Sequence, residues 1–300
     1  MGLALALIVV TLGFTLFTDN FFSAATFRTV MNQVPVLLVV SVGMTLVLIG
    51  GGIDLSVGSV LAVSAGMLGV ALNQWEWSVF PAIAASMALG FSCGLLSGGL
   101  VSYVGVPSFI VTLGMLEVAR GGAYLATNSR TEYLGDALDW LTASTFLGMS
   151  WPVWIALSVA VAAQSILSLT TFGRYVVAVG FNEETARLSG INTKRVTWAT
   201  FAIAGALSGL GAILYTARLS AADPNAGRGL ELEAIAAAVI GGTSLAGGRG
   251  SVLRTVVGVF IIAILGAGLA QMGAADSTKR VVSGTVIVLA VIADQFRRRK

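Results

Sequence analysis

Three ionisable side chains stand inside long apolar stretches, where they could bind ions or contact a substrate. Asp54 follows three glycines, and Glu117 and Arg120 lie three residues apart in an otherwise apolar segment. A charge at the centre of a bilayer costs about 2.5–3.5 kcal/mol on insertion scales, so each group must face a partner, a cavity or an interface. The i,i+3 spacing puts Glu117 and Arg120 on one face of a helix, which predicts an ion pair between them.

Each of these residues allows a structural and a functional interpretation. Asp54, with Ser56 two residues later, could cap the start of the next helix or could contact a transported substrate. The pair of Glu117 and Arg120 could fix the packing of helices or line a pathway. In a stand-alone secondary transporter, Asp54, Glu117 and Arg120 would instead couple transport to an ion gradient.

Most catalytic and metal-binding chemistry is excluded by residue types that the sequence lacks. It contains no histidine and a single cysteine, Cys93, which rules out an internal disulfide and a His- or Cys-based metal site. It also lacks the G-x-x-x-x-G-K-[ST] motif that binds ATP phosphates and the G-x-S-x-G motif of hydrolases. We therefore expect a chain that is not an enzyme and that binds no metal or cofactor itself.

The elements that position these residues are membrane helices. The 300 residues are 56% hydrophobic and 10% charged, with a mean hydropathy of +0.92, whereas soluble domains are about one-quarter charged. Apolar runs of about 20 residues, the length that crosses a bilayer, recur along the chain. The sequence therefore predicts an all-α membrane protein with about ten transmembrane helices in a single domain, residues 1–300. The predicted spans are 1–17, 34–51, 55–72, 80–104, 106–126, 151–170, 196–217, 232–247, 252–273 and 281–296.

An even number of spans places both termini on one side of the membrane. The basic loop 171–195 and the basic run Arg297–Lys300 then share that side, which the positive-inside rule identifies as the cytoplasm. The loops 127–150 and 218–231 fall outside, and leucines at helical spacing in the first of them predict an interfacial helix. We interpret the basic C-terminal run as a membrane anchor and expect no nucleic-acid partner.

Glycine clusters interrupt two of the predicted spans. Gly50 to Gly52 precede Asp54, and five further glycines lie between residues 241 and 250. Glycine-interrupted apolar segments are typical of broken helices that line a cavity in transporters.

The loop 171–195 carries the strongest local signal for a short helix. Asn182 is a good N-cap, the acids after it suit a first turn, and Gly190 suits the position after the last turn. These features predict a helix over about 183–189 on the cytoplasmic side. So much charge and capping in so apolar a chain favours a docking site over a simple connector. The residues expected to dock a partner are Asn182, Glu183, Glu184, Arg187, Leu188 and Gly190.

At these residues the chain resembles the permease subunit of bacterial ATP-binding-cassette (ABC) importers for monosaccharides such as ribose, xylose, arabinose and galactosides. The resemblance is carried by the segments 42–66, 106–127, 172–196 and 231–259. It implies a homodimer, or a heterodimer with a sister permease, in the bacterial inner membrane, with a translocation path at the dimer axis. It further implies ATPase subunits that bind ATP and Mg²⁺, and a periplasmic sugar-binding protein on the other side. Segment 182–190 would be the coupling helix on the ATPase, and alternating access would move the sugar.

Two features depart from the family pattern. Phe181 follows Gly180 where we expect a small residue, which could alter the fit to a particular ATPase. The chain also begins almost at the first predicted span, whereas many relatives carry a cytoplasmic tail.

Overall fold

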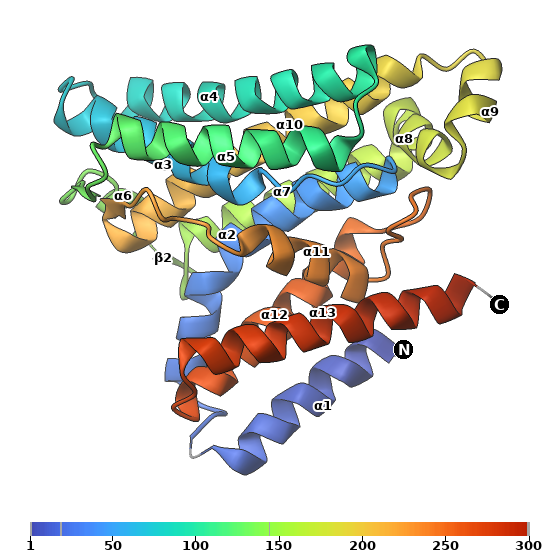
Figure 1. The fold of residues 1–300 in the computed structure, drawn as a ribbon. Helices are drawn as coiled ribbons and strands as arrows, with labels where there is room; N and C mark the ends of the chain where they lie inside the picture. Colours follow the sequence, from blue (N-terminus) through green and yellow to red (C-terminus); the bar gives the residue numbers. More distant parts are fainter. Residues whose placement is uncertain (1, 19, 144, 299–300) are drawn as a thin grey trace.

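Long, roughly aligned helices form the protein in a computed structural model that describes residues 2–18, 20–143 and 145–298 (Figure 1). Six described helices are long and apolar enough to cross a membrane: α2 (Ala24–Ile49), α4 (Val79–Gly99, extended by a π-helical turn Leu100–Val104), α5 (Ser108–Ala126), α7 (Trp151–Leu169), α10 (Thr193–Leu219) and α12 (Val252–Gln271). The other helices are α1 (Gly2–Phe17), α3 (Val57–Asn73), α6 (Asp139–Thr142), α8 (Thr171–Phe181), α9 (Glu183–Leu188), α11 (Leu230–Ile240) and α13 (Asp276–Arg298).

The centre of the bundle is α2, because it is apolar on every side. All its residues from Val34 to Ile49 are buried, and it contacts α7, α10, α11 and α12. A helix that is hydrophobic all round is expected in the middle of a bundle. It begins ten residues before the predicted span 34–51, since Ser23 caps it through a hydrogen bond from the Thr26 amide.

Small residues let α4 and α10 approach each other closely. A Cβ atom added at Gly90 would lie 2.6 Å from the carbonyl oxygen of Gly205, and one at Gly94 would lie 2.3 Å from that of Phe201. Such stripes pack membrane helices because lipid supplies no hydrophobic drive for their association.

The predicted span 232–247 is wrong as a complete crossing. Its helix, α11, has only 11 residues and is about 16 Å long, roughly half the hydrocarbon thickness. It gives way to a glycine-rich loop, residues 241–251, in which Gly242, Gly247 and Gly248 adopt positive φ angles. The sequence is therefore correct in placing a glycine-broken helix here, but it overestimates the helix length.

The two predicted outer loops also differ from expectation. Loop 127–150 holds a single-turn α6 and short strands instead of an amphipathic helix, because Leu134, Leu138 and Leu141 are buried against the bundle. Strand β1 (Glu132–Tyr133) pairs antiparallel with β4 (Ala221–Ala222), and β2 (Thr145–Phe146) pairs with β3 (Met149–Ser150). After β4, residues 223–229 turn back and contact α3 and α5. The loop 218–231, predicted to lie outside, is therefore partly packed against these two helices.

The first helix, the last helix and α9 each have one part at the same end of the molecule. Figure 1 shows the start of α1, the end of α13 and helix α9 at one end of the molecule, with α6 and β2 toward the other. The basic run Arg297–Lys300, predicted as an anchor, lies outside the residues whose side chains the structure describes.

Candidate functional site

Helix α9 forms because its capping residues satisfy both of its ends. The side chain of Asn182 accepts a hydrogen bond from the Thr185 amide at 2.8 Å. At the other end, Gly190 has φ of +84°, its amide bonds to the Arg187 carbonyl, and the Ile191 amide bonds to the Ala186 carbonyl. This double closure is a Schellman motif. The short helix expected over 183–189 is therefore present as Glu183–Leu188.

The surface of α9 presents charge and one apolar side chain to its surroundings. Glu184 and Arg187 form an ion pair at 2.6 Å, with side chains 64% and 62% exposed. The hydrogen bond and charge of Arg187 lower the pKa of Glu184, and those of Glu184 raise the pKa of Arg187. Leu188 is 77% exposed. The exposed face of α9 therefore carries an ordered ion pair with one apolar side chain beside it.

Helices α8 and α9 enclose a groove on this same end of the molecule. The cavity between them has a volume of about 350 Å³. Phe181, the residue that departs from the expected family pattern, lies at the junction of the two helices and forms part of its wall. The other lining residues are Arg174, Val177, Ala178, Asn182, Thr185, Ala186, Ser189 and Ile191.

Two glycine-rich segments and the end of α8 meet directly behind α9. The amide of Gly248 bonds to the carbonyl of Ile49 at 2.8 Å. A Cβ atom at Gly180 would lie 1.8 Å from that carbonyl oxygen, and one at Gly247 would lie 2.9 Å from the Cα atom of Gly51. The end of α8 is thus in backbone contact with both glycine-rich breaks, the one after α2 and the one after α11.

Asp54 lies in the extended segment between α2 and α3. It is 2% exposed and accepts hydrogen bonds from the amide and the hydroxyl of Ser56, at 2.9 and 2.6 Å. Of the two interpretations of Asp54, the one in which it caps α3 is wrong, since Ser56 occupies the cap position. Both bonds reach Oδ1, so the carboxylate closes a local turn through that one oxygen.

The predicted ion pair between Glu117 and Arg120 is absent. Among the described residues, Arg187 and Glu184 do form an ion pair, but Glu117 and Arg120 do not. Arg120 donates hydrogen bonds to the backbone carbonyls of Pro224 and Ala226, at 2.7 and 2.8 Å. Glu117 lies on the exposed surface of α5. Arg120 bonds to the loop after β4 and not to Glu117, because the loop supplies two carbonyl acceptors that point to the same guanidinium nitrogen.

Residues that sequence reasoning missed lie beside Arg120. The hydroxyl of Tyr124 donates to the side chain of Asn225 at 2.7 Å and accepts from Arg228 at 2.5 Å. Asn225 also bonds to the carboxylate of Asp223 through its amide and its side chain. Residues 223–229 are rich in residue types that favour turns, so a turn could have been predicted there. Nothing in the sequence indicates that this turn packs against α5.

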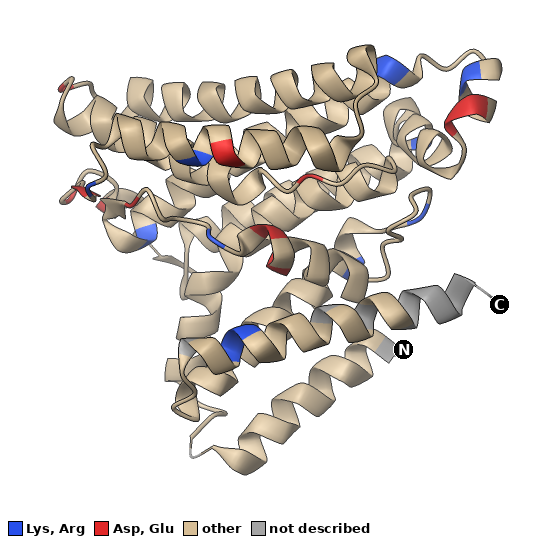
Figure 2. Ribbon diagram, in the orientation of Figure 1, with Lys and Arg blue, Asp and Glu red and all other residues tan. Residues whose placement is uncertain are grey.

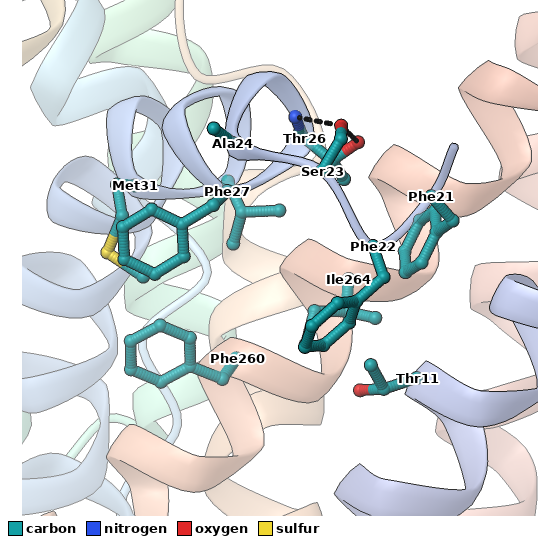
Figure 3. A pocket seen from close by; sticks show the side chains of 11 residues that line it. Thr11, Phe21, Phe22, Ser23, Ala24, Thr26, Phe27, Met31, Phe260 and Ile264 are labelled. Carbon is teal, nitrogen blue, oxygen red and sulfur yellow. Dashed lines mark hydrogen bonds between the residues drawn. The ribbon is translucent and has the colours of Figure 1, made fainter.

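The charges of this region lie on α5 and around the start of α11. Figure 2 shows acidic and basic positions part-way along α5, on the segment before α11 and in the first turn of α11. By contrast, the cavity between α1, α2 and α12, about 490 Å³ in volume, is walled by aromatic and aliphatic side chains (Figure 3). It offers few groups that could hydrogen-bond a polar substrate.

Comparison with known proteins identifies relatives over nearly the whole chain. A family model described as the permease component of branched-chain amino acid transport systems matches residues 26–291. The chain is 39% identical to the ribose import permease protein RbsC of Escherichia coli (strain K12), covering 98% of this chain and 93% of that protein. It is 32% identical to the xylose transport system permease protein XylH of the same strain, covering 98% and 91%. It is 30% identical to the fructose import permease protein FrcC of Rhizobium meliloti, covering 93% and 80%. No solved structure matches the chain. These matches confirm the resemblance to permeases of sugar importers.

Proposed function

Because the chain belongs to the family described as the permease component of branched-chain amino acid transport systems, we propose that it is the membrane subunit of an ABC importer. It would lie in the bacterial inner membrane and pass a monosaccharide from a periplasmic binding protein to the cytoplasm by alternating access. ATP and Mg²⁺ would be bound by a separate ATPase subunit. The observation that carries this proposal is the capped, exposed α9, since a permease without an ATP site needs a docking surface for its motor.

A monosaccharide is the substrate class that the relatives support best. The family description names amino acids, but three similar relatives are named for ribose, xylose and fructose. The permease itself need not bind the sugar tightly when a separate protein delivers it. The pathway is therefore expected to be lined by polar groups that exchange hydrogen bonds easily.

A second permease subunit, in a homodimer or a heterodimer, would cover the charged face of α5. Glu117 is exposed near the middle of a membrane-spanning helix, beside Gly114 and Gly121, whose added Cβ atoms would meet nothing within 4 Å. An exposed carboxylate at that depth is costly against lipid, and small residues favour close approach of another helix. A partner subunit packed against the glycines, with a water-filled path between the two subunits, would account for both the exposed carboxylate and the small residues.

The ion-coupled alternative requires Asp54, Glu117 and Arg120 to act together. In the described part of the chain, no hydrogen bond or ion pair joins any two of them. Nothing in the structure therefore favours this alternative over the importer.

The proposal is tested by isolating the detergent-solubilised protein from its own cells and identifying what accompanies it. We expect a P-loop ATPase with the native chain and none when residues 182–190 are replaced by a Gly/Ser linker. A milder variant, E184K/R187E, should also lose the ATPase. The control D136K/D139K changes two exposed charges at the other end of the molecule and should keep it. Absence of any ATPase from the native sample would contradict the importer, and would call for ion-gradient flux assays on Glu117 and Arg120.

A further inference from the structure

Residues 223–229 form an irregular segment that reaches membrane depth. Within it, Gly227 packs backbone to backbone against Gly58, because a Cβ atom at Gly58 would lie 2.2 Å from the Gly227 carbonyl oxygen. Gly58 is the second residue of α3, which has 17 residues and is therefore about 25 Å long. The end of α3 at Asn73 bonds to Glu132 and Tyr133 in the outer loop. Gly227 thus lies most of a helix length below that surface.

Backbone without regular secondary structure is tolerated at such depth only inside protein or beside water. Arg120 supplies part of the protein environment, since it binds two carbonyls of the segment. The side chains of Asn225 and Arg228, however, are exposed in this chain. Polar groups that protrude from a broken helix region near the membrane interior mark substrate sites in transporters.

The exposed groups form a small network that keeps spare hydrogen-bonding capacity. Tyr124 uses its hydroxyl as donor to Asn225 and as acceptor from Arg228. The guanidinium of Arg228 carries five N–H groups, and only one of them makes this bond. The neighbouring charges of Arg120, Arg228, Asp223 and Glu231 balance in sign, so the site does not require a charged ligand. Its chemistry suits a neutral molecule with many hydroxyl groups.

We propose that Tyr124, Asn225 and Arg228 form a sugar-contact cluster that binds hydroxyl groups of the substrate in the outer half of the pathway. Arg120 is the positioning residue, because it fixes the segment that presents Asn225 and Arg228. This inference rests on the proposed function, which supplies the sugar as substrate.

The first test measures transport by the complete importer in proteoliposomes, with ribose, xylose and fructose as probes. Y124F and N225A should each lower sugar moved per ATP hydrolysed by about five- to tenfold, the effect of losing one or two hydrogen bonds to a neutral ligand. ATPase stimulation by the loaded binding protein should stay at the native level, because docking and the motor are untouched. The control Y133F removes a hydroxyl from an exposed tyrosine on β1 and should transport normally. R120Q should lower transport with a normal yield of assembled complex.

The second test asks whether the cluster faces water. In a C93S background, N225C and R228C should react with a membrane-impermeant maleimide, and transport-driving conditions with sugar should slow the reaction. V118C, on the surface of α5 away from the segment, is the comparison and should react little. Native transport ratios in Y124F and N225A, or no labelling at 225 and 228, would overturn the sugar-contact cluster alone. Failure of the native complex to move any of the three sugars would instead overturn the proposed function.

Discussion

For the substitution Gly180→Ala, the tertiary structure and the local sequence predict opposite changes in stability. Gly180 lies in α8, one residue from its end, and its φ angle is not in the left-handed region. Alanine is a better helix former than glycine by about 0.8–1.0 kcal/mol, so propensity alone predicts a more stable protein. The structure predicts the opposite, because three backbone segments meet at this position.

The expected magnitude follows from the contacts of the added methyl group. Its Cβ atom would lie 1.8 Å from the Ile49 carbonyl oxygen and 2.7 Å from the Gly248 nitrogen, so it would crowd both atoms of the hydrogen bond that joins those residues. Forced overpacking costs about 1–3 kcal/mol, and loss of the hydrogen bond costs about 0.5–1.5 kcal/mol. After the gain in helix propensity, a net loss of about 2 kcal/mol remains, or about 4–8 °C in Tm on the scale of soluble domains.

The assay is thermal unfolding of the purified protein in detergent. After heating to each temperature, the fraction that still elutes as a monodisperse peak on gel filtration is measured. Gly266→Ala is the matched control, since that position is helical and an added Cβ atom would meet nothing within 4 Å. The control should match or slightly exceed the native Tm. If Gly180→Ala proves as stable as the control, the three-segment contact behind α9 is wrong, and so is the inference that α8 touches both helix breaks.

Four further outcomes follow from the described contacts. Glu184→Arg and Arg187→Glu should each weaken ATPase binding. The double variant should restore the hydrogen-exchange protection of α9, because it rebuilds the ion pair within the helix. It should still bind the ATPase weakly, because the charges that face the ATPase are reversed. Because the pKa of Glu184 is lowered in the folded chain, the stabilisation of α9 by the ion pair should be complete above the usual glutamate pKa and should vanish as the pH falls through the lowered value. Amide-exchange protection of α9, corrected for intrinsic exchange rates, should show this pH dependence in the native chain but not in Arg187→Ala. Asn182→Ala should destabilise α9 by about 1 kcal/mol through loss of its cap, visible as faster amide exchange across the helix. Glu117→Gln should leave the melting temperature unchanged, whereas Arg120→Ala should cost about 1–3 kcal/mol because the two backbone carbonyls it bonds lose their donor; equal effects of the two changes would restore the ion-pair interpretation.

The long helices and the short helix α9 could be predicted from the sequence because their causes are local. The cap at Asn182, the left-handed glycine at Gly190 and the acids between them lie within nine residues. Long apolar runs likewise report membrane helices without any tertiary information. Predicted boundaries therefore agree with most of the long helices to within a few residues, with α2 as the main exception.

The partners of the polar residues could not be read in the same way. Spacing paired Arg120 with Glu117, yet its acceptors lie more than 100 positions away, at Pro224 and Ala226. An i,i+3 distance makes a contact available, but it does not show that no better partner exists elsewhere. The same limit hid the network around Tyr124, whose partners also belong to the segment after β4.

By itself, the sequence determined that this is a helical membrane protein without ATP-binding or common catalytic motifs, and with a capped helix that suits a partner. Only the tertiary structure decided that α11 is a half-length helix, that residues 223–229 pack against α3 and α5 and that Gly180 contacts the glycine breaks after α2 and α11. The physical reason is that hydropathy and capping act over a few turns of chain. Backbone contacts between glycines and hydrogen bonds to distant carbonyls exist only once the helices are packed.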